Sequence, residues 1–198
     1  AKLAETLDSE ELYRIVLTEL QTAIGAQYGG LMLIQDEGTI SRLVLSTHPL
    51  DVDAPADITV PVQGNPIAEY VIGTQQPFVA EDLLNDPRFE PMWDVQEARD
   101  VRAMLIVPVI MGGRVIGTIG LDSNVPRPFT EAEIELAMTA ANQAAIAIEK
   151  MPKIINRSRP NCPAPAALRS CCALIIPKNE QLRSAPDRRA DTADGDSL

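Results

Sequence analysis

Hydrophobic side chains recur at helical spacing near both ends of the ordered part of this sequence and alternate with polar ones in between. Over residues 8–24 the apolar positions form one stripe, which predicts an amphipathic helix. Asp8 and Glu11 have the spacing of a capping box at its start, and Gly25 is placed to end it. The pattern therefore predicts a helix that packs one face against a core.

A second helical pattern begins at residue 130, where Thr130 and Glu133 form another capping box. Apolar residues occupy two faces of this C-terminal helix, and a helix with two apolar faces has two neighbours to satisfy. We expect the second face to pack on the first helix or on another copy of the chain. That face consists mostly of small residues: Leu136, Ala140, Ala144 and Ala147.

Between these helices, short apolar runs bounded by glycine and proline predict strands. A short helix is expected from Pro66 to Gly73, because proline suits the first position of a helix. Loops are expected over residues 47–64, which contain three prolines, and over residues 83–100. The predicted strands cover residues 28–34, 39–46, 77–82, 102–111 and 114–122.

The strand over residues 102–111 has no polar side chain from Ala103 onward. Both of its faces must therefore be covered. Gly112-Gly113 joins it to the next strand as a two-residue hairpin turn. Antiparallel hairpins with helices at both ends indicate an α+β fold, in which the terminal helices cover one face of the sheet. What covers the second face is the question that this strand raises.

Charge and composition limit the domain and its partners. The net charge of -11 argues against nucleic acid and anionic lipid, and no apolar run reaches the roughly 20 residues of a bilayer span. Without a secretion signal, a cytoplasmic protein is expected. Residues 1–150 carry 9 Lys+Arg against 23 Asp+Glu, whereas residues 151–198 carry 8 against 5. This shift predicts a domain over residues 1–150 and a Pro- and Arg-rich tail over 151–198 that is mostly disordered.

Residues suited to catalysis are scarce. All three cysteines, Cys162, Cys171 and Cys172, follow residue 150, so the predicted domain has no thiol chemistry. His48 is the only histidine, which leaves no zinc site and no Ser-His-Asp triad. A haem axial ligand needs only one such side chain, although an ordinary residue at a strand end is the simpler interpretation. The sequence therefore predicts a binding module without a metal site, not an enzyme.

Several motifs occur in the order that one family shows. Residues 100–109 (DVRAMLIVPV) resemble the central strand of GAF domains, and residues 115–121 (VIGTIGL) and 129–133 (FTEAE) resemble the strand and helix start that follow it. Residues 79–89 resemble the preceding strand and loop of the family. The resemblance covers roughly residues 8–150. It implies a GAF-like, PAS-related antiparallel sheet with the terminal helices on one face and a ligand pocket on the other.

The same resemblance implies where a ligand would bind. In GAF domains a short helix and loops roof the pocket over the second face of the sheet. Aromatic side chains of this sequence are available there, and Arg102 and Thr118 are possible polar contacts. The expected ligand-binding residues are Tyr70, Phe78, Phe89, Trp93, Arg102, Met104 and Thr118.

Cofactors known from the family are not implied for this chain. Bilin-binding members attach their pigment through a cysteine, which residues 1–150 lack. Cyclic-nucleotide-binding members carry an Asn-Lys pair, but Ser123 and Asn124 stand at the aligned positions, so the lysine is missing. The cofactor or ligand is therefore unknown at this stage.

The resemblance implies a regulatory sensor of a signalling protein such as a two-component sensor kinase or a cyclase. A small-molecule ligand would act through the terminal helices, which in the family often form a homodimer. The alternative is a dimerisation or structural module whose pocket is filled by its own side chains. Trp93 and Phe78 distinguish the two: packed into the pocket they favour the alternative, and lining a cavity they favour the sensor.

Overall fold

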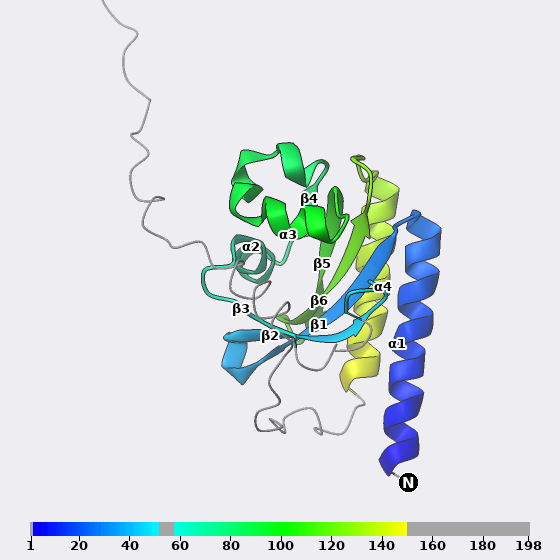
Figure 1. The fold of residues 1–198 in the computed structure, drawn as a ribbon. Coiled ribbons are helices and arrows are strands. Elements are labelled where there is room, and N and C mark those ends of the chain that lie inside the picture. The colour runs from blue at the N-terminus through cyan, green and yellow to red at the C-terminus, as the bar shows by residue number, and fades with distance from the viewer. Residues whose placement is uncertain (1, 52–57, 150–198) are drawn as a thin grey trace, which may run out of the picture.

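The computed structural model of the 198-residue chain describes residues 2–51 and 58–149 (Figure 1). The predicted tail lies outside the described residues. One antiparallel sheet has the strand order β3-β2-β1-β6-β5-β4, so the first and last hairpins meet at its centre. The strands are β1 (Tyr28–Gln35), β2 (Ile40–Ser46), β3 (Thr59–Pro61), β4 (Phe78–Ala80), β5 (Ala103–Met111) and β6 (Arg114–Ser123).

Helices lie on both sides of this sheet. The two long ones, α1 (Lys2–Ile24) and α4 (Glu131–Glu149), run side by side along one face (Figure 1). The other side carries α2 (Pro66–Thr74), α3 (Trp93–Ala98) and short 3-10 helices at Leu83–Asn85 and Pro87–Met92, while another 3-10 turn, Asp36–Gly38, joins β1 to β2. The α+β fold with the terminal helices on one face is confirmed.

Local sequence signals account for most of the element ends. Gly25, Gly112 and Gly113 all have positive φ angles, at the end of α1 and in the β5–β6 turn. The Thr130 amide donates to Glu133 Oε2 at 2.7 Å and the Glu133 amide donates to Thr130 Oγ1 at 3.3 Å, which is the predicted capping box of α4.

Three predicted boundaries are wrong. Helix α1 already begins at Lys2, so Asp8 lies inside it and does not cap it. Residues 59–61, expected in a loop, form edge strand β3, where a proline is tolerated because one side of the strand is unpaired. Helix α3 lies in a stretch expected to be irregular; its 6 residues are too few to show a helical period.

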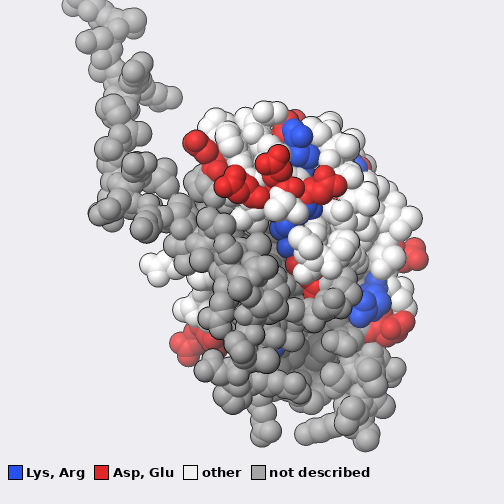
Figure 2. Space-filling model, in the orientation of Figure 1, with Lys and Arg blue, Asp and Glu red and all other residues white. Residues whose placement is uncertain are grey.

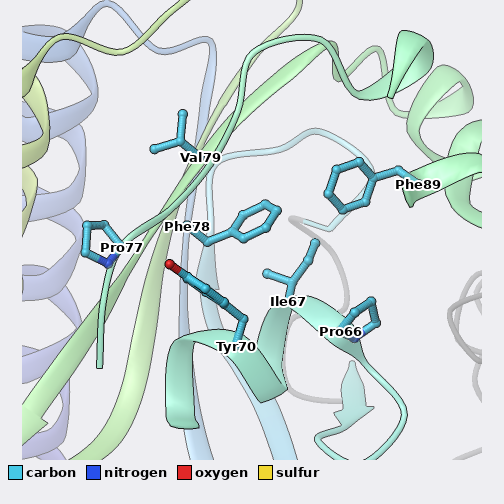
Figure 3. A pocket seen from close by; sticks show the side chains of 7 residues that line it. All are labelled: Pro66, Ile67, Tyr70, Pro77, Phe78, Val79 and Phe89. Atoms are coloured by element: carbon cyan, nitrogen blue, oxygen red, sulfur yellow. The ribbon is translucent and has the colours of Figure 1, made fainter. Parts of the chain in front are cut away.

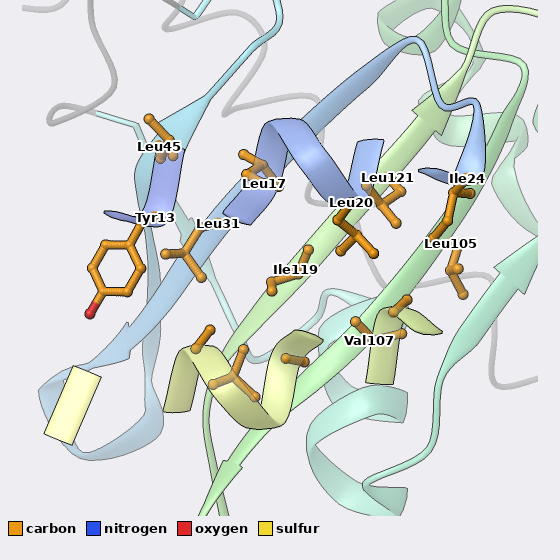
Figure 4. Close-up of a cluster of buried hydrophobic side chains, with 14 of the residues drawn as sticks. Tyr13, Leu17, Leu20, Ile24, Leu31, Leu45, Leu105, Val107, Ile119 and Leu121 are labelled. Carbon is orange, nitrogen blue, oxygen red and sulfur yellow. The ribbon is translucent and has the colours of Figure 1, made fainter. Parts of the chain in front are cut away.

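The core under α1 and α4 is aliphatic (Figure 4). Leu17 and Leu20 of α1 meet Leu105 and Leu121 from the sheet, all of them buried. Alanines form the contact face of α4, which lets the helix lie close to β5. The full set of strictly buried residues in this cluster is Tyr13, Leu17, Leu20, Ile24, Leu31, Leu33, Leu45, Ala103, Leu105, Val107, Val109, Ile119, Leu121, Phe129, Ala137, Ala141, Ala144 and Ala145.

This packing corrects the expected second face of the C-terminal helix. Ala144 is 4% exposed and belongs to the core instead of facing outward. Ala140 is partly buried against the same core, whereas Leu136 is 42% exposed. The Ala147 side chain lies outside the described part of the molecule. Small residues thus serve the close approach of α4 to the sheet, and the outward face is larger and more mixed.

Candidate functional site

The second face of β5 is covered by a separate hydrophobic cluster, which we call the roof cluster. Met104 projects from β5 into this cluster, and α2 and the segment from β4 to α3 supply its other members. The cluster answers the question raised by the apolar strand, because it buries the face that α1 and α4 do not reach. Its strictly buried residues are Ile67, Val71, Ala80, Leu83, Phe89, Met92, Val101 and Met104.

A pocket of about 310 Å³ opens beside the roof cluster, between α2 and edge strand β4 (Figure 3). Three aromatic rings line it in a row. The Tyr70 and Phe78 ring centroids are 5.9 Å apart and those of Phe78 and Phe89 are 5.7 Å apart, both edge to face. The complete lining is Pro66, Ile67, Tyr70, Pro77, Phe78, Val79 and Phe89. The lining offers apolar and aromatic surface with one phenol.

A buried polar network, which we call the clasp, ties the end of β2 to the end of α3. Arg99 donates from both terminal nitrogens to the Asp51 carboxylate, at 2.8 and 2.7 Å. Ser46 Oγ donates to the same carboxylate at 2.9 Å. Burial acts to raise the pKa of Asp51, but the hydrogen bonds and charge of Arg99 outweigh it and hold the pKa below its usual value. The clasp is therefore an ion pair that links the segment after β2 to the end of α3, two segments far apart in sequence.

The GAF domain model matches residues 8–148, which is most of the chain. The chain belongs to the GAF domain family. The solved structures agree with this fold. The GAF domain/HD domain protein from Geobacter sulfurreducens aligns with a TM-score of 0.62 at 16% identity, covering 73% of this chain and 94% of that one.

Two further structures show the same likeness. A GAF domain from an Acinetobacter phosphoenolpyruvate-protein phosphotransferase has a TM-score of 0.56 at 18% identity, covering 68% of this chain and 78% of the other. A methyl-accepting chemotaxis protein, residues 122 to 287, has a TM-score of 0.59 at 20% identity, covering 72% and 90%. Among curated proteins, none matches this sequence. At such low identities these similar structures establish the fold alone.

The GAF pocket brings together three of the seven residues expected to bind a ligand. Tyr70, Phe78 and Phe89 line it, with Tyr70 44% exposed at its rim. Met104 is buried in the roof cluster. Trp93 also packs on that cluster, and its indole nitrogen donates to the Leu83 carbonyl at 2.7 Å. Trp93 and Met104 therefore belong to the roof cluster and do not line the pocket.

The two expected polar contacts lie elsewhere. Arg102 Nη2 donates to Asp82 Oδ1 at 3.0 Å. This partly exposed ion pair lies beside the start of β5. Thr118 lies on the middle of β6, opposite Met32 of β1 and Pro108 of β5, and does not line the pocket. The pocket lies instead between α2 and edge strand β4.

His48 belongs to the clasp, a role that the sequence did not reveal. The Leu50 amide donates to His48 Nδ1 at 3.2 Å, so the ring proton sits on Nε2, which donates to the Arg99 carbonyl at 2.8 Å. Both ring nitrogens are thus engaged, and the ring offers none to a haem iron. Across the described ranges, no group of three or more His, Cys, Asp or Glu side chains is placed to hold a metal.

The central strands leave a partly exposed floor on the pocket side of the sheet. Along β1 and β6, helix-facing residues are buried, while those on the other face are only partly covered. Asp122 lies on this floor, directly opposite Tyr28 of β1 and Met104 of β5. Burial raises the pKa of Asp122 to about 7, with Arg99 acting in the opposite direction and Asp51 adding to the rise. No spacing motif marks this residue in the sequence.

None of the helices within residues 2–51 and 58–149 is long and apolar enough to cross a bilayer.

Proposed function

We propose that this GAF domain is a regulatory module that binds a small molecule, and that the pocket between α2 and β4 receives an apolar or aromatic part of the ligand. The row of Tyr70, Phe78 and Phe89 around an open volume of about 310 Å³ carries this proposal. A concave, mostly apolar site with few polar groups is typical of small-molecule pockets.

The sheet offers a route from this pocket to the terminal helices. Phe78 and Val79 are part of β4, which pairs with β5, and β5 packs on its other face against α4. A ligand that moves β4 would therefore shift the strand on which α4 rests. Transmission of this kind fits a cytoplasmic signalling protein such as a sensor kinase or cyclase, in which an effector would read the position of α4.

A second candidate function is a structural module without a ligand. The roof cluster favours it, because its own side chains already fill the space over much of β5. Trp93 and Phe78, which distinguish the two functions, point to different ones. Trp93 packs on the roof cluster and supports the structural module, whereas Phe78 lines the pocket and supports the sensor. The pocket, which no side chain of the described residues fills, gives the sensor the stronger case.

Ligand release tests the proposal directly. Mass spectrometry of small molecules freed from the purified protein should detect a bound compound that is lost in Tyr70→Ala. Val125→Ala is a control, since Val125 is also an exposed hydrophobic residue, 55% exposed against 44% for Tyr70, but follows β6 and does not line the pocket. A protein that carries nothing, and whose pocket amides do not shift in NMR spectra with any small apolar compound, would contradict ligand binding.

We also propose a homodimer through the outward faces of the terminal helices. Ile15 of α1 is 52% exposed, and Leu136 and Ile146 of α4 are 42% and 58% exposed, although all three are aliphatic. Leu136→Glu should yield monomers in sedimentation velocity while the melting temperature stays nearly unchanged. Ala144→Glu, by contrast, would place a charge in the core and unfold the domain. An unmutated protein that is monomeric at high micromolar concentration would contradict the dimer.

A further inference from the structure

The pocket-side floor of β1 and β6 has features of a binding surface at its centre. Gly30 and Gly120 face each other across the two strands and carry no side chains of their own. A Cβ added at Gly30 would make ordinary contacts, with Leu45 O at 3.6 Å and Leu43 Cδ1 at 3.7 Å. A Cβ added at Gly120 would have only one atom within 4 Å, the Ile106 Cγ1 at 3.9 Å. Both glycines are partly exposed even though they lie in central strands. Within residues 2–51 and 58–149, the floor therefore has room for a ligand atom over Gly120.

Asp122 stands at the edge of this room without a hydrogen-bond partner for its carboxylate among the described residues. It is two positions from Gly120, so both face the same side of the sheet. The charges near it are already committed, because Arg99 and Asp51 neutralise each other in the clasp. Partial burial raises the pKa of this carboxylate even though the charge of Arg99 acts to lower it, and a bound cation would favour its ionised form.

The ring of Tyr28 completes the surroundings of Asp122. Tyr28 lies directly opposite Asp122 and its ring packs on His48 at a centroid distance of 4.3 Å. An aromatic ring beside a carboxylate is a combination that recognises ammonium groups, through an ion pair on one side and a cation–π contact on the other. Arg99 and Asp51 are the charges that act on Asp122, and His48 is the ring that Tyr28 contacts; all three are held in the clasp. Arg102 and Asp82, on the same side of the sheet, form a separate ion pair at the start of β5.

The charge of the outer surface also favours a cationic ligand. Figure 2 shows acidic side chains gathered over the end of the molecule that carries α3. Glu90, Asp94, Glu97 and Asp100 are all exposed there. Acidic residues around a site raise the local concentration of cations. They do not form the site, but they favour a positively charged ligand over an anion.

We propose that Asp122 and Tyr28 bind the protonated amine of a small organic ligand whose body lies over Gly30 and Gly120. This inference rests on the proposed function, because it names the class of ligand that the same sheet face would take. It places the charged group on the central strands, apart from the apolar pocket at the β4 edge.

Three probes that share one ring test the proposal: 2-phenylethylamine, 2-phenylethanol and 3-phenylpropionate, titrated into the full chain with amide NMR as the readout. The amine should bind at least about tenfold tighter than the alcohol and shift the amides of Tyr28, Gly30, Gly120 and Asp122. Its affinity should rise about tenfold from pH 6 to pH 8, because Asp122 ionises in that interval while the amine stays protonated.

Variants separate this site from general electrostatics. Asp122→Asn should remove the preference for the amine over the alcohol, whereas Asp94→Asn, which makes the same change of charge on α3, should keep it. Tyr28→Leu should weaken amine binding about two- to fivefold through the lost cation–π contact.

The outcomes also separate the two proposals. Equal affinity for amine and alcohol, or an amine preference that survives Asp122→Asn, overturns the amine site. In either case, binding of the alcohol at the β4 pocket would still support the proposed function. If none of the three probes binds and no compound is released from the purified protein, both proposals fail.

Discussion

The two faces of the sheet use the same strands for different purposes. Under α1 and α4, Leu105 and Leu121 have 0% exposure in an aliphatic core closed by the alanines of α4. On the other face, Asp122, Tyr28 and Gly120 remain partly exposed beside a clasp of hydrogen-bonded charges. The helix side of the central strands is thus closed by one aliphatic core, whereas the other side combines the buried roof cluster with a partly exposed floor that carries a carboxylate.

The largest expected loss of stability comes from a substitution in β5, where two consecutive residues face opposite sides of the sheet. Leu105 faces the aliphatic core, so Leu105→Ala should cost about 2–5 kcal/mol of unfolding free energy. Ile106 is partly buried on the roof side, and Ile106→Ala should cost about 1–2 kcal/mol. Urea denaturation monitored by circular dichroism measures both. Equal losses would show that the roof side is packed as tightly as the helix side.

Asp122→Asn should stabilise the domain, whereas the two substitutions in β5 destabilise it. The pKa of Asp122 is raised in the folded state, so its ionisation opposes folding: the penalty is absent below about pH 4, grows as pH rises and is complete above the folded pKa of about 7. The amide avoids this cost and should stabilise the domain by roughly 2–4 kcal/mol at pH 8.

Thermal melts at pH 8 and pH 5 check that prediction. The gain in melting temperature should shrink markedly at pH 5, where the folded carboxyl is protonated. Asp94→Asn serves as the control, because Asp94 is exposed on α3. A loss of stability in Asp122→Asn would mean that the carboxylate holds the floor together and is not left for a ligand.

The smallest contrast involves two glycines of β6. A Cβ at Gly117 would overlap the carbonyl oxygen of Met32 on β1, so Gly117→Ala should cost about 1–3 kcal/mol. A Cβ at Gly120 would make only an ordinary contact, with Ile106 Cγ1 at 3.9 Å, so Gly120→Ala should change stability by less than about 0.5 kcal/mol. Denaturant midpoints measure the difference. If Gly120→Ala destabilised as much as Gly117→Ala, the floor would be closed and the proposed amine site would have no room.

The sequence by itself determined the elements whose signals are local. Thr130 and Glu133 predicted the start of α4, and Gly112-Gly113 predicted the β5–β6 turn, because caps and tight turns depend on residues within about four positions. The apolar run of β5 also required a cover on both faces, and the roof cluster supplies it. The aromatic residues of the pocket came from the family resemblance, and three of them meet there.

Tertiary structure decided which distant residues share a site. Asp51 and Arg99 are 48 positions apart, and Tyr28 meets Asp122 only because β1 and β6 are neighbours at the centre of the sheet. A hydrophobic pattern gives the period of a strand but not its partner or register, so it could not show that Asp122 lies opposite Tyr28 or that Ala144 is buried. Those properties arise when long-range pairing sets which side chains are enclosed together.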